Sequence, residues 1–369
     1  MKASRRTINV APQTSFRSTD GKLVLIAGPC SAESEEQMLK TAQQLKNIKG
    51  ISVYKAGIWK SRTRPNSFAG VGTVGLQWLD MVKQETGLRT ACEVANAQQA
   101  EEALKHGVDI LCISGRATVN PFAVEEIAAV LQGTNTPVLV NNPVYPDLDL
   151  WIGALERLQQ VGLTDLGVIN RGFAAAEQYP YRNHPRWDHI LQLRERMPEL
   201  PILCDASHIA GKRSLLYPVS QRAVEMGTDG LLFESHSNPA AALSSPQQQL
   251  MPQELELLVH AIASNVKLTE TTEHVEELDE LRKQIDNLDE ELLELLLRRT
   301  SVTKKINRQG LSCDLTPVQV NRWQQQLTSW LHQENATGLD GNLVRTFVQA
   351  LQQHTQGTQD GAMGRSAVA

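Results

Sequence analysis

Short apolar runs recur along the first 265 residues, and stretches with helical periodicity lie between them. The starts of these runs lie 22 to 36 residues apart, a spacing typical of parallel strands joined by helices. The eight runs are 23–30, 52–60, 88–94, 110–114, 137–142, 166–172, 201–208 and 230–236. The pattern predicts a (β/α)8 barrel over residues 21–267, after an N-terminal extension of residues 1–20. A doubly wound open sheet is disfavoured, because no GxGxxG turn follows the first run.

A different pattern begins near residue 275. Over 275–308 apolar residues recur at alternating steps of three and four, which predicts one long helix with a helix–helix seam. The seam residues are Leu278, Leu281, Ile285, Leu288, Leu292, Leu295, Val302 and Ile306. Shorter helices are expected over about 317–333 and 339–355. We therefore predict a small all-α domain over 272–357 and a disordered tail over 358–369. From this pattern alone, a plain antiparallel coiled-coil dimerisation module is favoured.

The charge distribution supports this division and excludes several classes of protein. The net charge is −5, yet residues 1–269 carry 26 acids and 26 bases, whereas residues 270–299 carry 11 acids and 4 bases. A neutral body argues against a nucleic-acid binder. No apolar run is long enough to span a membrane, and no secretory signal is expected at the N-terminus. The five separated cysteines form no CxxC pair, which favours a reduced cytoplasmic location.

Each predicted strand of the barrel ends near a polar or reactive side chain. In chain order these are Cys30, Lys60 with Arg62, Glu93, Arg116, Asn141, Arg171, His208 and Glu234. Because barrel active sites lie at the carboxyl ends of the strands, we expect the whole set to converge there. Taken singly, each residue is better explained by a strand that reaches solvent, but that explanation is poor for the whole set.

Two kinds of chemistry are represented in this set. Cys30, His208 and Glu234 are thiolate, imidazole and carboxylate donors that suit a divalent ion such as Mn, Fe, Co or Zn. Spacing alone favours a simpler interpretation, with a buried cysteine, a surface histidine and a solvated glutamate. Lys60, Arg62, Arg116 and Arg171 predict a polyanionic, phosphorylated substrate, and the alternative is surface salt bridging.

The barrel segment resembles 3-deoxy-D-arabino-heptulosonate-7-phosphate (DAHP) synthase over about residues 20–265. The motifs that carry the resemblance are AGPCSAES (27–34), KSRTRPNSFAGVG (60–72), CEVANAQQAEEAL (92–104), GRATVNPFAVEEI (115–127), INRGF (169–173), CDASHIAGKR (204–213) and ESHSNPAAALSSPQQQ (234–249). That family is a (β/α)8 barrel that condenses phosphoenolpyruvate (PEP) with erythrose 4-phosphate, the first step of the shikimate pathway.

The resemblance also implies roles for individual residues. Cys30, His208 and Glu234 match metal ligands, and Cys30, His208 and Lys60 match catalytic positions. The residues that it implies for substrate binding are Lys60, Arg62, Thr63, Glu93, Arg116 and Arg171, with Arg62 and Thr63 in the aldose-phosphate loop.

The sequence departs from the pattern of that family at four positions. Ser245 stands where the family has a metal-binding Asp, and Asn141 stands where it has a PEP-binding Lys. Ser61 and Gly115 replace Pro and Ala in the KPRT and GAR motifs. We expect the first two changes to weaken metal and PEP binding and the last two to be mild.

The C-terminal segment LDELRKQIDNLDEELLELLLRR (278–299) resembles the start of the all-helical chorismate mutases, and the resemblance extends over about 276–360. It implies a homodimer that rearranges chorismate to prephenate. Arg282, Arg299, Arg322 and Gln359 match its substrate contacts, whereas Gly310 replaces its catalytic Lys. The missing cation is expected to cost about 10²–10³ in rate.

Three functional hypotheses follow. The leading one is a metal-dependent DAHP synthase fused to a chorismate mutase domain. The second is a degenerate paralogue that binds anions or regulates a partner with little turnover. In the third, the barrel condenses PEP with a different sugar.

Overall fold

The structure is a computed structural model that describes residues 14–18, 21–60, 62, 66–174, 180–268, 272–308, 325, 328–329 and 344–351. The chain divides into two compact units, Met1–Lys267 and Leu268–Ala369. None of the described helices is long and apolar enough to cross a membrane.

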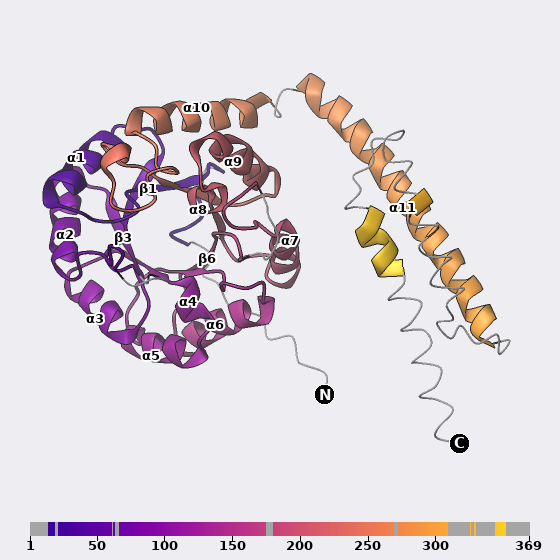
Figure 1. Cartoon of the computed structure of the whole chain (residues 1–369), viewed down its shortest axis with the longest axis horizontal. Coiled ribbons are helices and arrows are strands. Elements are labelled where there is room, and N and C mark those ends of the chain that lie inside the picture. Colours follow the sequence, from indigo (N-terminus) through magenta and orange to yellow (C-terminus); the bar gives the residue numbers. More distant parts are fainter. Residues whose placement is uncertain are drawn as a thin grey trace, which may run out of the picture. The chain divides into compact units, whose positions relative to one another are not determined.

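The eight predicted strands form one closed parallel barrel, in which each strand pairs with its sequence neighbours and β8 pairs with β1 (Figure 1). The strands are β1 (Val24–Gly28), β2 (Ile51–Ala56), β3 (Arg89–Val94), β4 (Ile110–Ile113), β5 (Val138–Asn141), β6 (Leu166–Asn170), β7 (Ile202–Asp205) and β8 (Gly230–Glu234). The predicted (β/α)8 architecture is therefore confirmed.

Helices surround the barrel on its outer side (Figure 1). The longer ones are α1 (Glu35–Leu45), α2 (Val74–Thr86), α3 (Ala97–Lys105), α5 (Pro121–Leu131), α6 (Leu148–Gln160), α7 (Trp187–Arg196), α9 (Leu216–Glu225) and α10 (Pro252–Leu268). Several begin at a residue that favours helix starts. The side chains of Ser34, Asn96, Asn120 and Asp147 each accept a hydrogen bond from a backbone N–H of the first turn. Two short helices, α4 (Gly115–Thr118) and α8 (Ala206–Ala210), were not predicted, and both follow a strand directly.

The inside of the barrel is a second apolar core, distinct from the layer between strands and helices. Its fully buried members are Phe16, Ile26, Val53, Ala91, Ile110, Cys112, Leu139, Ile169, Leu203 and Leu232. Alternate strand residues point inward, so the interior is packed with side chains and forms no channel.

Phe16 closes the amino-terminal end of this core. It lies outside the strands, in the segment before β1, yet none of its surface is exposed. Both the backbone N–H and the hydroxyl of Ser15 donate to the Asp165 carboxylate, at 2.9 and 2.6 Å. Nε of Arg17 donates to Asp229 at 2.9 Å. Since Asp165 and Asp229 directly precede β6 and β8, the segment is fixed across the strand starts and leaves the opposite end as the entrance.

The second unit contains α11 (Thr272–Arg308), which matches the long helix predicted for 275–308. Five predicted seam side chains, Ile285, Leu288, Leu292, Leu295 and Val302, are each more than half exposed. Residues 344–351 are helical, as predicted. Most of the predicted helix 317–333 and the predicted tail 358–369 lie outside the described residues.

Replacing Phe16 with Ala should lower the free energy of unfolding by about 3–5 kcal/mol, because it opens a cavity at a closed end of the barrel. The measurement is urea unfolding followed by circular dichroism. Phe122→Ala is the control, since Phe122 is 75% exposed on α5 and should change stability by only about 0.5 kcal/mol. Equal effects of the two substitutions would show that Phe16 does not close the core.

Candidate functional site

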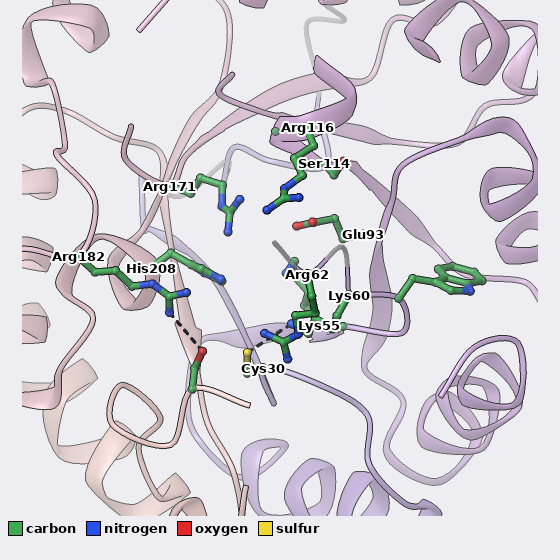
Figure 2. A pocket seen from close by; sticks show the side chains of 14 residues that line it. Cys30, Lys55, Lys60, Arg62, Glu93, Ser114, Arg116, Arg171, Arg182 and His208 are labelled. Atoms are coloured by element: carbon green, nitrogen blue, oxygen red, sulfur yellow. Dashed lines mark hydrogen bonds between the residues drawn. The ribbon is translucent and has the colours of Figure 1, made fainter. Parts of the chain in front are cut away.

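A cavity of about 210 Å³ lies where the carboxyl ends of the strands meet (Figure 2). We call it the mouth cavity. Seven of the side chains predicted from strand ends line it, namely Cys30, Lys60, Arg62, Glu93, Arg116, Arg171 and His208. Glu234 and Asn141 are buried and do not line the mouth cavity. The sequence analysis missed Lys55, Trp59, Ser114 and Arg182, which also line it.

The two unpredicted short helices place two of these residues. Ser114 caps α4 by accepting from the backbone N–H of Ala117, and α4 carries Arg116. Asp205 caps α8 by accepting from the backbone N–H of His208 at 3.0 Å. Serine and aspartate are favoured capping residues, so a cap directly after a strand was the signal for these helices.

His208 is held by buried carboxylates on both sides of its ring. Its Nδ1 lies 2.7 Å from Asp205 Oδ2, and its Nε2 lies 3.6 Å from Glu234 Oε1. Burial raises the pKa of Asp205, but the neighbouring His208 and Lys55 outweigh that effect and hold the pKa far below its ordinary value. A carboxylate on Nδ1 is the usual way to orient a metal-binding imidazole, because it fixes which nitrogen faces the ion.

Cys30 and Glu234 complete the predicted donor set. Lys60 Nζ donates to Cys30 Sγ at 3.3 Å, and Gln248 Nε2 donates to Glu234 Oε2. Burial raises the pKa of the Cys30 thiol and Glu234 raises it further, whereas Lys60 opposes the rise. The donor types suit a divalent transition metal. Among the described residues, however, no three His, Cys, Asp or Glu side chains are grouped closely enough to hold one.

Glu93 and Lys55 are half-buried opposite charges that line the mouth cavity. Burial raises the pKa of Glu93, but Arg171, Lys55 and Lys60 outweigh it, so its pKa stays below the ordinary value. Burial lowers the pKa of Lys55, and the nearby Glu93 leads the groups that raise it above its ordinary value. Both side chains are therefore charged at neutral pH. A lysine within the mostly apolar strand β2 was the sequence signal for this pair.

Two of the four positions that depart from the family pattern, Asn141 and Ser245, have uncharged side chains that contact charged neighbours. Asn141 Nδ2 donates to the Ile113 carbonyl at 2.8 Å and to Glu93 Oε2 at 3.4 Å. Ser245 lines the mouth cavity, and its hydroxyl accepts from Arg182 Nη1 at 3.2 Å. Neither position adds a charge to the mouth cavity.

The loop after β2 folds back on itself. Trp59 forms an isolated antiparallel bridge with Gly70, and the backbone N–H of Lys60 donates to the Ala69 carbonyl at 2.8 Å. Arg62 Nε donates to the Phe68 carbonyl at 2.8 Å, which fixes its guanidinium at the mouth cavity. Ser61 and Thr63 lie outside the described residues.

Cations outnumber carboxylates around the mouth cavity. Its lining includes Lys55, Lys60, Arg62, Arg116, Arg171 and Arg182, against one carboxylate, Glu93. The Arg116 and Arg171 side chains extend toward each other over the cavity (Figure 2). Several guanidinium and ammonium groups in one cavity can hold two anionic reactants together, because they reduce the repulsion between them.

In the second unit, only part of the predicted chorismate mutase site is described. Arg299 lies in α11 and is half-buried. Arg282 also lies in α11, but its side chain is outside the described residues. Gly310, Arg322 and Gln359 lie outside them entirely.

Comparisons with known proteins divide the chain in a similar way. The family model described as DAHP synthetase I family matches residues 7–272, and that described as chorismate mutase type II matches residues 281–359. A phospho-2-dehydro-3-deoxyheptonate aldolase of Thermotoga maritima is 29% identical over 254 residues, which are 67% of this chain and 73% of that protein. A 2-dehydro-3-deoxyphosphooctonate aldolase of Campylobacter jejuni is 30% identical over 251 residues, covering 60% of this chain and 88% of the relative.

Solved structures of DAHP synthase also resemble this chain. The crystal structure of the Thermotoga maritima DAHP synthase matches with a TM-score of 0.61 and 28% identity, over 68% of this chain and 70% of that one. A truncated form of the enzyme matches with a TM-score of 0.58 and 26% identity, over 68% of this chain and 88% of that one. Together with the barrel and its cationic mouth, these matches show that the chain belongs to the DAHP synthetase I family and carries a chorismate mutase type II domain.

Proposed function

We propose that the barrel condenses PEP with erythrose 4-phosphate to give DAHP and inorganic phosphate. The observation that carries this proposal is the convergence of six cationic side chains on the mouth cavity. Both reactants are phosphate esters and PEP also has a carboxylate, so they need a cavity of this charge. Neither the fold nor the family matches favour the degenerate alternative.

We assign PEP to Lys60, Arg116 and Arg171, with Glu93 beneath them. Arg116 and Arg171 point at one another and can grip a phosphate from two sides (Figure 2). Glu93 stays ionised because Arg171 leads the cations that lower its pKa, and its charge limits the net positive charge of the cavity. The aldose phosphate is assigned to Arg62 and Thr63.

The reaction joins two carbon centres. The PEP methylene carbon attacks the aldehyde carbon, water adds to the resulting cationic carbon, and the phosphate then leaves. The cations lower the repulsion between the reactants and stabilise the negative charge that develops as they meet. The contribution of the barrel is thus mainly positioning and charge stabilisation.

Cys30, His208 and Glu234 are the residues that would hold a divalent metal beside the mouth cavity, and they would have to move closer together to do so. Their donor types fit such an ion, and Asp205 orients His208 as metal sites require. When bound, the ion supplies Lewis-acid polarisation of the aldehyde oxygen. Ser245 gives a neutral hydroxyl where the family has a carboxylate, so we expect weak affinity.

For the second domain we propose chorismate mutase activity in a homodimer formed through α11. Arg299 lies on the same face as the apolar seam and is half-buried, as expected for a substrate contact inside a helical assembly. Arg282, Arg322 and Gln359 are the other proposed contacts. Five seam side chains are exposed in the single chain, and a second copy would cover them.

The separated cysteines support a cytoplasmic location.

The barrel function predicts phosphate release when the purified full chain receives PEP, erythrose 4-phosphate and Mn²⁺. His208→Ala should abolish it and lower the metal content measured by plasma mass spectrometry. His189→Ala, which alters a buried histidine on α7 away from the mouth cavity, is the matched control. Phosphate release no faster than in His208→Ala would refute the proposed condensation.

The dimer predicts that Leu292→Glu converts the protein to a monomer, because a charge on the seam would be buried without a partner. The measurement is sedimentation velocity of the full chain. Glu290→Gln, another exposed α11 position, should leave the assembly state unchanged. A Leu292→Glu protein with the assembly state of the parent would rule out this interface.

A further inference from the structure

Arg182 reaches the mouth cavity from a loop that no strand-end pattern predicts. It lies between β6 and α7, and Arg182 and His208 both line the mouth cavity (Figure 2). The backbone N–H groups of Arg182 and Asn183 both donate to the Ile209 carbonyl, at 2.9 and 3.3 Å. Asn183 Nδ2 donates to the His208 carbonyl at 2.9 Å. The loop is therefore anchored on α8, the helix that carries His208.

A glycine makes room for this arginine. Gly211 ends α8 with a φ of +69°, a conformation that glycine adopts without strain. A Cβ at this position would lie 2.4 Å from Arg182 Cβ, and a larger residue would push the arginine away. The approach of Arg182 to the site is thus set by the end of α8.

The described contacts of the Arg182 guanidinium are neutral and involve one of its nitrogens. Nη1 donates to Ser245 Oγ at 3.2 Å, the dashed line from Arg182 in Figure 2, and to Gln248 Oε1 at 2.7 Å. Within the described ranges no carboxylate forms an ion pair with it. The edge formed by Nε and Nη2 has the spacing that binds phosphate or carboxylate in a bidentate manner.

Ser245 and Gln248 hold the guanidinium in place without neutralising it. Ser245 has a φ of +47°, which is uncommon for serine and marks a constrained position. Gln248 gives its amide N–H to Glu234, so its carbonyl oxygen is turned toward Arg182. A carboxylate in place of the Ser245 hydroxyl would pair with Nη1 and reduce the charge available to a ligand.

We propose that Arg182 is an anion-binding residue of the mouth cavity that holds a phosphate ester group, and that the neutral Ser245 keeps its charge available. The assignment of that phosphate to a substrate rests on the proposed condensation. Arg182 adds a cation on the His208 side of the mouth cavity, separate from Arg116 and Arg171.

Isothermal titration calorimetry tests this with the full chain in the presence of a chelator. Inorganic phosphate, PEP and erythrose 4-phosphate are each titrated alone, so no turnover is involved. Arg182→Gln should weaken binding of inorganic phosphate and of one substrate by about tenfold or more. Arg222→Gln, an exposed arginine paired with Glu225 on α9, should bind as the parent does. The substrate that loses affinity identifies which phosphate Arg182 holds.

A second pair of variants isolates the charge. Ser245→Asp and Ser245→Asn have nearly equal size, and both side chains tolerate a positive φ. The Asp variant should bind phosphate about tenfold more weakly than the Asn variant, because only Asp neutralises Arg182. If Arg182→Gln fails to fold, the comparison of the two Ser245 variants still tests whether the charge of Arg182 binds phosphate.

Two results would overturn the proposal, namely an Arg182→Gln protein with parental affinity for all three anions, or equal affinities of the two Ser245 variants. The proposed condensation is measured separately by DAHP formation. A parent that forms no DAHP yet loses phosphate affinity with Arg182→Gln would refute the condensation and support the Arg182 site.

Discussion

Opposite charges buried under the strand ends hold the barrel mouth together. Asp205 and Glu234 are buried carboxylates and Glu93 is half-buried, and neighbouring cations lower the pKa of all three although burial raises it. Lys55, from within β2, is charged among them. A buried charge that lost its partner would cost several kcal/mol, so each group needs the others. This mutual dependence ties the cations of the mouth cavity to the carboxylates beside them.

The barrel supplies the geometry that this balance needs. Strand ends bring groups far apart in sequence to one rim, and the short helices α4 and α8 bring Arg116 and His208 within reach of it. Phe16 closes the opposite end, so the apolar interior supports the charged layer from below. The charged layer then presents several cationic edges upward, which is what two phosphorylated reactants require.

Much of this could be predicted from local sequence patterns. Apolar runs located all eight strands, and residues that follow them, such as Cys30 and Arg171, line the cavity because strand ends converge in every barrel of this kind. Arg182 could not be found that way, since its place depends on how its loop packs on α8. Lys55 was missed because its partners come from other strands. For Arg322 and Gln359, which lie outside the described residues, the roles remain predictions from resemblance.

The pKa of Glu93 tests the charge balance most directly. It can be measured by ¹³C NMR of carboxyl-labelled glutamate in the full chain, with Glu93→Gln to assign the resonance. The account predicts that Glu93 is ionised at neutral pH and titrates below the ordinary value of 4.5. Its resonance should therefore hardly move between about pH 8 and pH 6. A Glu93 that titrates near or above neutral pH would contradict the account, because burial would then outweigh the surrounding cations.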